Sequence, residues 1–164
     1  MKKLLAVLFV ISFLTSSAGL VAQIRVVVLP FQNMDGAISL NVWSYKLQDS
    51  VAKVILSLDP NGKYYQLVPS DSVDNLLTQF NLDPTNPQYP SDMWKAVKML
   101  NVNKVISGNF NVKNQRYLIN AYIYNVRTKL ADPDNQAKDI FKKEENVMES
   151  VGIIVDAIKP ALIK

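Results

Sequence analysis

The residue types that most often carry out chemistry in proteins are scarce in this 164-residue chain. It contains no histidine and no cysteine. This excludes Ser-His-Asp and Cys-His nucleophiles, typical zinc sites and histidine-ligated haem. The chain has five glycines, and none of them is spaced as a phosphate-binding loop requires. We therefore expect no catalytic residue, no cofactor and no metal site, and we interpret the chain as a non-enzyme.

One acidic stretch, Asp132 to Asn135 (DPDN), begins like a calcium-binding loop. An EF-hand loop has glycine at its sixth position and glutamate at its twelfth. Counted from Asp132, these positions hold Ala137 and Lys143, so the pattern fails. The sequence favours a plain turn here.

The most suggestive polar pattern lies in residues 102–126, where two β-rich runs separated by Lys113 to Gln115 predict a hairpin. Alternation places Tyr117, Ile119, Ala121 and Ile123 on one face of the second arm. Polar and aromatic side chains gather on the opposite face, which suits contact with a protein or a glycan. A solvated face, or one covered by the closing helix, is the structural alternative. The candidate partner-binding residues of this face are Asn109, Asn111, Asn120, Tyr122 and Tyr124.

Two further positions stand out near these strands. Tyr89 lies in a loop rich in proline (Pro84, Pro87 and Pro90), and we take it as a second candidate contact with a partner. Gly108 interrupts the first arm of the hairpin, where a glycine often marks a bulge or the close approach of another element. We favour close packing of a helix over a ligand contact at Gly108.

The elements that must position these residues follow from hydrophobic periodicity. Residues 25–31 form an apolar run without alternation, which indicates a strand buried on both faces. A helical stripe extends from Leu40 to Leu58, with Ser39 as its expected cap, and ends at the turn 59–62. The remaining expected elements are a strand at 64–69, a helix capped by Ser70 or Asp71, a helix capped by Ser91, the hairpin, a turn region at 128–136, a short strand at 137–145, and a closing helix from Val147 whose last turn Pro160 limits.

This order predicts a single α/β domain. The helix at 40–58 can carry a right-handed crossover between parallel strands, and the hairpin then extends the sheet in antiparallel fashion. We expect a two-layer or three-layer sandwich built on a mixed sheet of four to five strands, with about four helices.

Several segments, taken in order, resemble the TolB amino-terminal-like group of envelope domains. They are VVVLPFQN at 26–33, YQLVPSDSVDNLL at 65–77, LNVNKVISGNFNV at 100–112 and YLINAYIYNVRT at 117–128. The group includes the curli secretion lipoprotein CsgG, the flagellar outer-membrane protein FlgO and the peptidoglycan synthase activator lipoproteins. The resemblance covers most of residues 24–164 and implies their shared fold. It departs from the group at Lys129, where a glycine is usual, and in lacking a lipidation cysteine.

The first residues have the layout of a secretory signal peptide. Lys2 and Lys3 precede an apolar run, Leu4 to Leu14, which is short for a permanent membrane anchor. Cleavage after Ala18 and cleavage after Ala22 both fit, and an uncleaved anchor is the alternative. We expect residues 1–22 to be the signal peptide and residues 23–164 to be one domain.

The expected destination is the periplasm or the outer-membrane periphery of a Gram-negative-type bacterium. Without Lys2 and Lys3, 16 basic residues face 14 acidic ones. This balance and the export signal argue against a nucleic-acid partner.

The sequence therefore predicts an assembly or accessory component that binds envelope protein partners. It is compatible with a homo-oligomer and with a membrane-proximal location without a lipid anchor of its own. The alternative is a periplasmic small-ligand or glycan binder that uses Asn120, Tyr122 and Tyr124.

Overall fold

The computed structural model describes residues 23–163, so the expected signal peptide at residues 1–22 lies outside the described part of the chain. No helix within residues 23–163 combines the length and apolar character that crossing a membrane requires.

The described residues form one mixed sheet with the strand order β3-β1-β4-β5-β6. β1 pairs in parallel with β3 and β4, and β4, β5 and β6 follow one another in antiparallel fashion. β2 is a two-residue strand that pairs with β4, which brings the sheet to six strands. The strands are β1 (Ile24–Val28), β2 (Gln32–Asn33), β3 (Tyr65–Leu67), β4 (Lys104–Lys113), β5 (Arg116–Asn125) and β6 (Leu130–Lys143).

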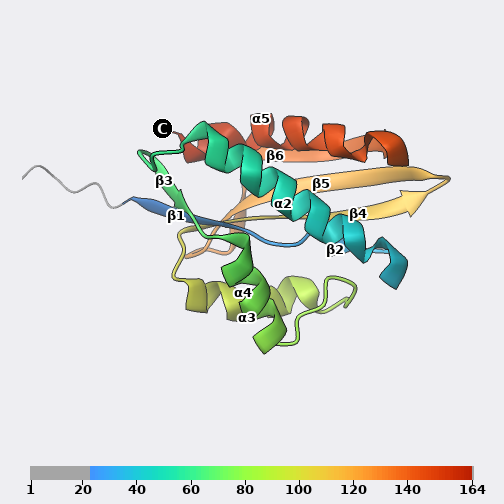
Figure 1. Ribbon diagram of the computed structural model, residues 1–164, viewed down its shortest axis with the longest axis horizontal. Helices are drawn as coiled ribbons and strands as arrows, with labels where there is room; N and C mark the ends of the chain where they lie inside the picture. Colours follow the sequence, from blue (N-terminus) through green and yellow to red (C-terminus); the bar gives the residue numbers. More distant parts are fainter. Residues whose placement is uncertain (1–22, 164) are drawn as a thin grey trace, which may run out of the picture.

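Helices cover both sides of this sheet. Figure 1 shows α2 and α5 on one side and α3 and α4 on the other, so the domain is a three-layer α/β sandwich. The predicted fold class is confirmed. The helices are α2 (Asn41–Leu58), α3 (Ser70–Gln79), α4 (Tyr89–Leu100) and α5 (Ser150–Leu162), and two 3-10 helices, η1 (Ile38–Leu40) and η2 (Glu144–Glu149), precede α2 and α5.

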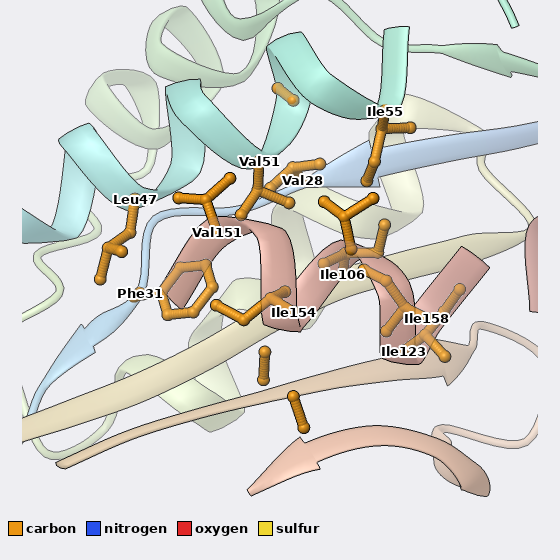
Figure 2. Packing of buried hydrophobic residues seen from close by; sticks show 14 of the residues in the cluster. Val28, Phe31, Leu47, Val51, Ile55, Ile106, Ile123, Val151, Ile154 and Ile158 are labelled. Carbon is orange, nitrogen blue, oxygen red and sulfur yellow. The ribbon is translucent and has the colours of Figure 1, made fainter. Parts of the chain in front are cut away.

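The unbroken apolar run of β1 supplies both layers of the core, as its lack of alternation predicts. Val26 and Val28 face α2 and α5, whereas Val27 and Leu29 face α3 and α4. Figure 2 shows the first of these two clusters, in which Phe31 lies between the helices and the sheet. The strand itself ends at Val28, three residues earlier than predicted, because the Phe31 N–H turns away to donate to Ser44 O.

The expected serine caps are wrong. Ser39 lies inside η1, and α2 begins after it without a capping side-chain hydrogen bond. α3 begins at Ser70 itself, after Pro69. α4 begins at Tyr89, so Ser91 lies within its first turn. Pro90 favours this earlier start, because its fixed φ suits the first turn and its missing N–H is not needed there.

The structure also corrects the C-terminal part of the sheet. The predicted turn region and the short fifth strand form one irregular strand, β6, with register shifts opposite β5. A local turn does occur at Asp132, whose side chain accepts the N–H groups of Asp134 and Asn135. These residues bulge out of the strand because Pro133 offers no N–H to the ladder.

Pro160 lies inside α5, which continues to Leu162.

Asp59 organises the predicted turn between α2 and β3. Its buried carboxylate accepts the N–H groups of Lys63 at 2.8 Å, Tyr64 at 2.7 Å and Tyr65 at 3.1 Å. Desolvation by itself would raise the pKa of Asp59. The three backbone N–H groups and the Lys63 charge outweigh desolvation, so the pKa lies below its usual value.

This lowered pKa gives a pH-dependent prediction. A carboxyl whose pKa is lower in the folded state stabilises the fold above its unfolded pKa, and the stabilisation is lost as the pH falls through the folded pKa. We expect Asp59→Asn to be less stable than the wild type at pH 7, and this difference to shrink below about pH 4. Urea unfolding of both proteins from pH 7 to pH 3 measures it. If the difference in unfolding free energy between the two proteins stayed constant from pH 7 to pH 3, the lowered pKa of Asp59 would be contradicted.

Candidate functional site

The hairpin of β4 and β5 is regular along its whole length. Every residue from Lys104 to Lys113 pairs with one from Asn125 to Arg116. Because Lys113 itself pairs with Arg116, the connection has two residues, one fewer than predicted. Asn114 and Gln115 form it with φ values of 52° and 58°, the positive angles that a tight hairpin turn of type I′ needs.

The register confirms the predicted division of the hairpin into two faces. Ser107 lies opposite Tyr122, Asn109 opposite Asn120, and Asn111 opposite Leu118. The other face is apolar and belongs to the core under α2 and α5. Gly108 lies on that buried side, and the group that approaches it is the Phe31 ring together with Asn120 O. The expected close approach is therefore present, but a loop residue makes it and not a helix.

The polar face is covered only in part. At one end, Trp94 of α4 packs edge-on against Tyr124, with ring centroids 5.9 Å apart, and Ser107 is buried. Figure 1 shows the hairpin continuing beyond α3 and α4. The side chains on this stretch are partly or fully exposed. We call this surface the open face and define it as Asn109, Asn111, Leu118, Asn120, Tyr122 and Phe141.

Phe141 is the member of the open face that the sequence reasoning missed. It lies on β6 opposite Leu118, and its side chain is 60% exposed. The sequence signal was the alternation Ile140, Phe141, Lys142, which places Ile140 in the core and Phe141 on the other side. This signal is short and lies beside charged residues, which is why the strand alone was predicted.

Two asparagines of the open face are held in place by hydrogen bonds. Asn120 Nδ2–H donates to Asn109 Oδ1 at 2.9 Å. Asn120 Oδ1 accepts the backbone N–H of Asp139 at 2.9 Å. Asp139 has a φ of 55° and lies where the β5–β6 register shifts, so Asn120 links three strands across a bulge. Asn109 and Asn120 therefore present a rigid amide surface.

The two candidate tyrosines lie side by side on β5. The rings of Tyr122 and Tyr124 have centroids 6.0 Å apart, and Lys138 Nζ lies 6.0 Å from the Tyr122 ring. Burial, and secondarily Tyr122, raises the pKa of Tyr124. The Tyr124 phenol therefore keeps its proton at neutral pH and can act as a hydrogen-bond donor. Tyr124 also packs against Trp94 and the α3/α4 core cluster, whereas Tyr122 is not part of that cluster.

Tyr89 is not a surface residue in this structure. It is 2% exposed, and its hydroxyl donates to Pro30 O at 3.0 Å. Burial raises its pKa. The proline-rich loop therefore places Tyr89 in the α3/α4 core, where its hydroxyl links the start of α4 to the loop that follows β1.

The structure brings Tyr89, Asn109, Tyr122 and Tyr124 around one small depression. Its volume is about 80 Å³. Small-molecule sites in proteins measure about 300–1,000 Å³, so this space is too small for a sugar ring. Within residues 23–163, no group of three or more acidic side chains is arranged to hold a metal ion.

No family model and no curated protein matches this sequence. Among solved structures, the NMR structure of E. coli LpoB is similar with a TM-score of 0.52 and 10% identity, over 74% of this chain and 59% of LpoB. The LpoB C-terminal domain from Salmonella enterica gives 0.49 and 16%, over 82% of this chain and 93% of that one. TolB from Acinetobacter baumannii gives 0.46 and 15%, over 85% and 28%. The similarity to E. coli LpoB shows a shared fold, and a relation to CsgG and FlgO stays a prediction.

Proposed function

We propose that this protein is a non-catalytic component of a Gram-negative-type cell envelope. It acts in the periplasm or at the outer-membrane periphery as an assembly or accessory subunit, and an envelope protein partner docks on the open face. The observation that carries the proposal is this face, a stretch of sheet that no helix of residues 23–163 covers, whereas helices cover the rest of the sheet on both sides. The LpoB-like fold and the expected export signal support the location.

The chemistry of the open face fits a protein partner. Tyr122, Leu118 and Phe141 provide apolar area, and the amides of Asn109 and Asn120 are already fixed by hydrogen bonds. Side chains held in place before binding lose little conformational entropy when a partner arrives. Aromatic residues are also the commonest energetic centres of protein interfaces.

Most of the described groups with a shifted pKa are moved away from neutrality; the exception is Asp74, whose pKa is raised by burial and by the nearby Asp49 and Asp71 carboxylates. Activated nucleophiles and bases need a pKa moved toward neutrality. In contrast, the pKa values of Tyr65, Tyr89 and Tyr124 are raised above the usual tyrosine value. The pKa of Asp59 is lowered by backbone N–H groups of its turn, and the pKa of Asp132 is lowered by the Asn135 side chain and then by the backbone N–H groups of Asp134 and Asn135. These shifts suit structural roles.

The direct test is site-specific photo-crosslinking in the native envelope. A photoreactive amino acid replaces Asn111 or Tyr122 on the open face, and Leu56 or Met99 as controls that are 54% and 57% exposed elsewhere on the surface. We expect one dominant partner from the open-face positions and background from the controls, identified by mass spectrometry. Equal crosslinking from all four positions would contradict the proposed face.

A matched pair of variants measures how much the face contributes. Asn111→Lys adds a charge to the open face, and Met99→Lys adds the same charge on α4. We expect Asn111→Lys to weaken partner capture about tenfold or more, because a lysine buried without an ion pair is costly at an interface. Met99→Lys should capture the partner normally. If both variants behave like the wild type, and a sugar or peptidoglycan fragment raises the melting temperature instead, the ligand-binding alternative holds.

A further inference from the structure

A row of basic residues crosses the sheet at the tip of the β4–β5 hairpin. Lys113 of β4 lies directly opposite Arg116 of β5, and Arg116 lies directly opposite Lys143 of β6. Side chains alternate along each strand, so these three exposed residues project from the same side of the sheet as the open face. We call them the basic row. It adjoins the outermost cross-strand set of the open face, which is Asn111, Leu118 and Phe141.

The basic row is unfavourable for the domain on its own. Facing residues of neighbouring strands have Cβ atoms about 4.5–5.5 Å apart, and like charges placed opposite each other are destabilising. Within residues 23–163, Lys113 and Arg116 form no ion pair. Lys143 Nζ lies 3.8 Å from Glu145 Oε1, but both side chains are more than 60% exposed, so this pair contributes little. The repulsion across the row is therefore largely uncompensated.

Protection of the sheet edge explains only one member of the row. Lysine on an edge strand discourages pairing with other chains, and Lys143 lies on the edge strand β6. Arg116 lies on β5, which has β4 on one side and β6 on the other, so its charge protects no edge. A binding role explains the charge of Arg116 better.

The positive charge is local to this part of the sheet. The strand segments that carry the open face and the basic row contain one acidic residue, Asp139, and these segments are 107–113, 116–122 and 136–143. Lys138 adds a further cation, with its Nζ 6.0 Å from the Tyr122 ring. Over the chain without its first 22 residues, by contrast, 16 basic residues face 14 acidic ones. A generally basic surface therefore does not account for the row.

We propose that the partner that docks on the open face presents acidic side chains to the basic row. This inference rests on the proposed function, because it names the chemistry of the same partner. The planar guanidinium of Arg116 can bind a carboxylate through two parallel hydrogen bonds, while Leu118 and Phe141 supply apolar contact beside it. Opposite charges placed across an interface increase the rate of association and select the correct partner.

A protein fits this surface better than an anionic lipid surface does. The amides of Asn109 and Asn120 lie on the same face and are fixed by a hydrogen bond between them. Their remaining hydrogen-bonding groups would lose water against acyl chains without gaining a partner, which is costly. A protein surface supplies backbone and side-chain groups that can replace this water.

Charge reversal at two arginines tests the proposal. Arg116→Glu changes the basic row, whereas Arg127→Glu makes the same change of net charge at an exposed residue beyond the other end of β5. Each variant carries the photoreactive amino acid in place of Tyr122. We expect Arg116→Glu to lower the crosslink yield at least about tenfold and Arg127→Glu to leave it unchanged. Raising NaCl from about 50 mM to about 500 mM should lower the yield of the unreversed protein, because salt screens exposed charges.

The controls separate this proposal from the proposed function. Arg116→Gln removes the charge without adding one and should give an intermediate yield, and circular dichroism checks that every variant is folded. If Arg116→Glu crosslinked as strongly as Arg127→Glu, the acidic partner would be wrong while docking on the open face would stand. Equal crosslinking from the open face and from the Leu56 and Met99 controls would instead contradict the proposed function.

A second measurement does not need the partner. Poly-L-glutamate is the probe, because its carboxylates reproduce the expected chemistry. In nuclear magnetic resonance spectra of the isotope-labelled protein at low salt, it should shift the amide signals of Lys113, Arg116 and Lys143. Arg116→Glu should lose this response and Arg127→Glu should keep it. No response in the wild type, or binding of the wild type to phosphatidylglycerol vesicles but not to poly-L-glutamate, would overturn the proposal.

Discussion

Replacing Gly108 with valine is expected to lower the free energy of unfolding by about 3 kcal/mol or more, at the upper end of overpacking effects. A Cβ atom at this position would lie 2.2 Å from Asn120 O and 2.3 Å from Phe31 Cε1. The Asn120 carbonyl belongs to β5 and cannot move without disturbing the hairpin. The Phe31 ring is fully buried among the side chains of the α2/α5 core cluster. Both neighbours therefore resist the change.

Gly152 provides the matched control for this prediction. It lies in α5, and a Cβ there would meet no atom of residues 23–163 within 4 Å. Gly152→Ala should raise stability by about 0.5–1 kcal/mol, because alanine is the better helix former. Urea unfolding of both variants and the wild type measures the two effects. If Gly108→Val proved as stable as the wild type, the close contact between Phe31 and the hairpin would be wrong.

Tyr89→Ala is expected to destabilise the protein by about 3–5 kcal/mol, as the loss of a buried aromatic ring does. Tyr89 is 2% exposed and lies in the α3/α4 core with Met93 and Val97. Tyr89 therefore contributes to stability in two ways, through the buried ring and through the hydrogen bond that its hydroxyl donates to Pro30 O. Tyr89→Phe keeps the ring and removes only this hydrogen bond, so a loss of about 1–2 kcal/mol is expected.

The conservative variant also separates the two roles considered for Tyr89. The comparison uses two proteins that carry the photoreactive amino acid in place of Tyr122, one with Tyr89 and one with Tyr89→Phe. If Tyr89 is a core residue, both should crosslink to the partner equally strongly. The measurements are thermal or urea unfolding for stability and crosslink yield for partner contact. If Tyr89→Phe were as stable as the wild type but no longer crosslinked, Tyr89 would be a residue that contacts the partner.

The sequence predicted those parts of the fold that rest on strong local patterns. The stripe from Leu40 to Leu58 became α2, and the apolar run of β1 became a strand buried on both faces. Side-chain alternation placed Asn109, Asn120 and Tyr122 on one surface, which the register confirms. These predictions succeeded for one reason. Burying one face of an element repeats its apolar residues every two positions in a strand and every 3.6 positions in a helix, and this period can be seen in the sequence.

The features that the sequence did not predict depend on distant parts of the chain. β2 has two residues and exists only because β4 lies beside it. β6 is long and bulged because β5 offers a partner along its whole length, which its polar sequence does not reveal. Burial of Tyr89 depends on the Pro30 carbonyl, 59 residues away. Local composition carries no information about such neighbours, so a proline-rich loop is interpreted as exposed.

The position of β1 in the sheet has a consequence for the order in which the chain folds. β1 is the first element of the described chain, yet its partners begin at Tyr65 and Lys104, so the sheet cannot close around it early. β4, β5 and β6 are consecutive and can pair locally, which makes them the faster unit. A chain delivered from its amino end would expose the run VVVLPF, 26–31, until most of the domain had arrived. This stretch is then a hydrophobic strand without partners, the kind of segment that aggregates or needs a chaperone.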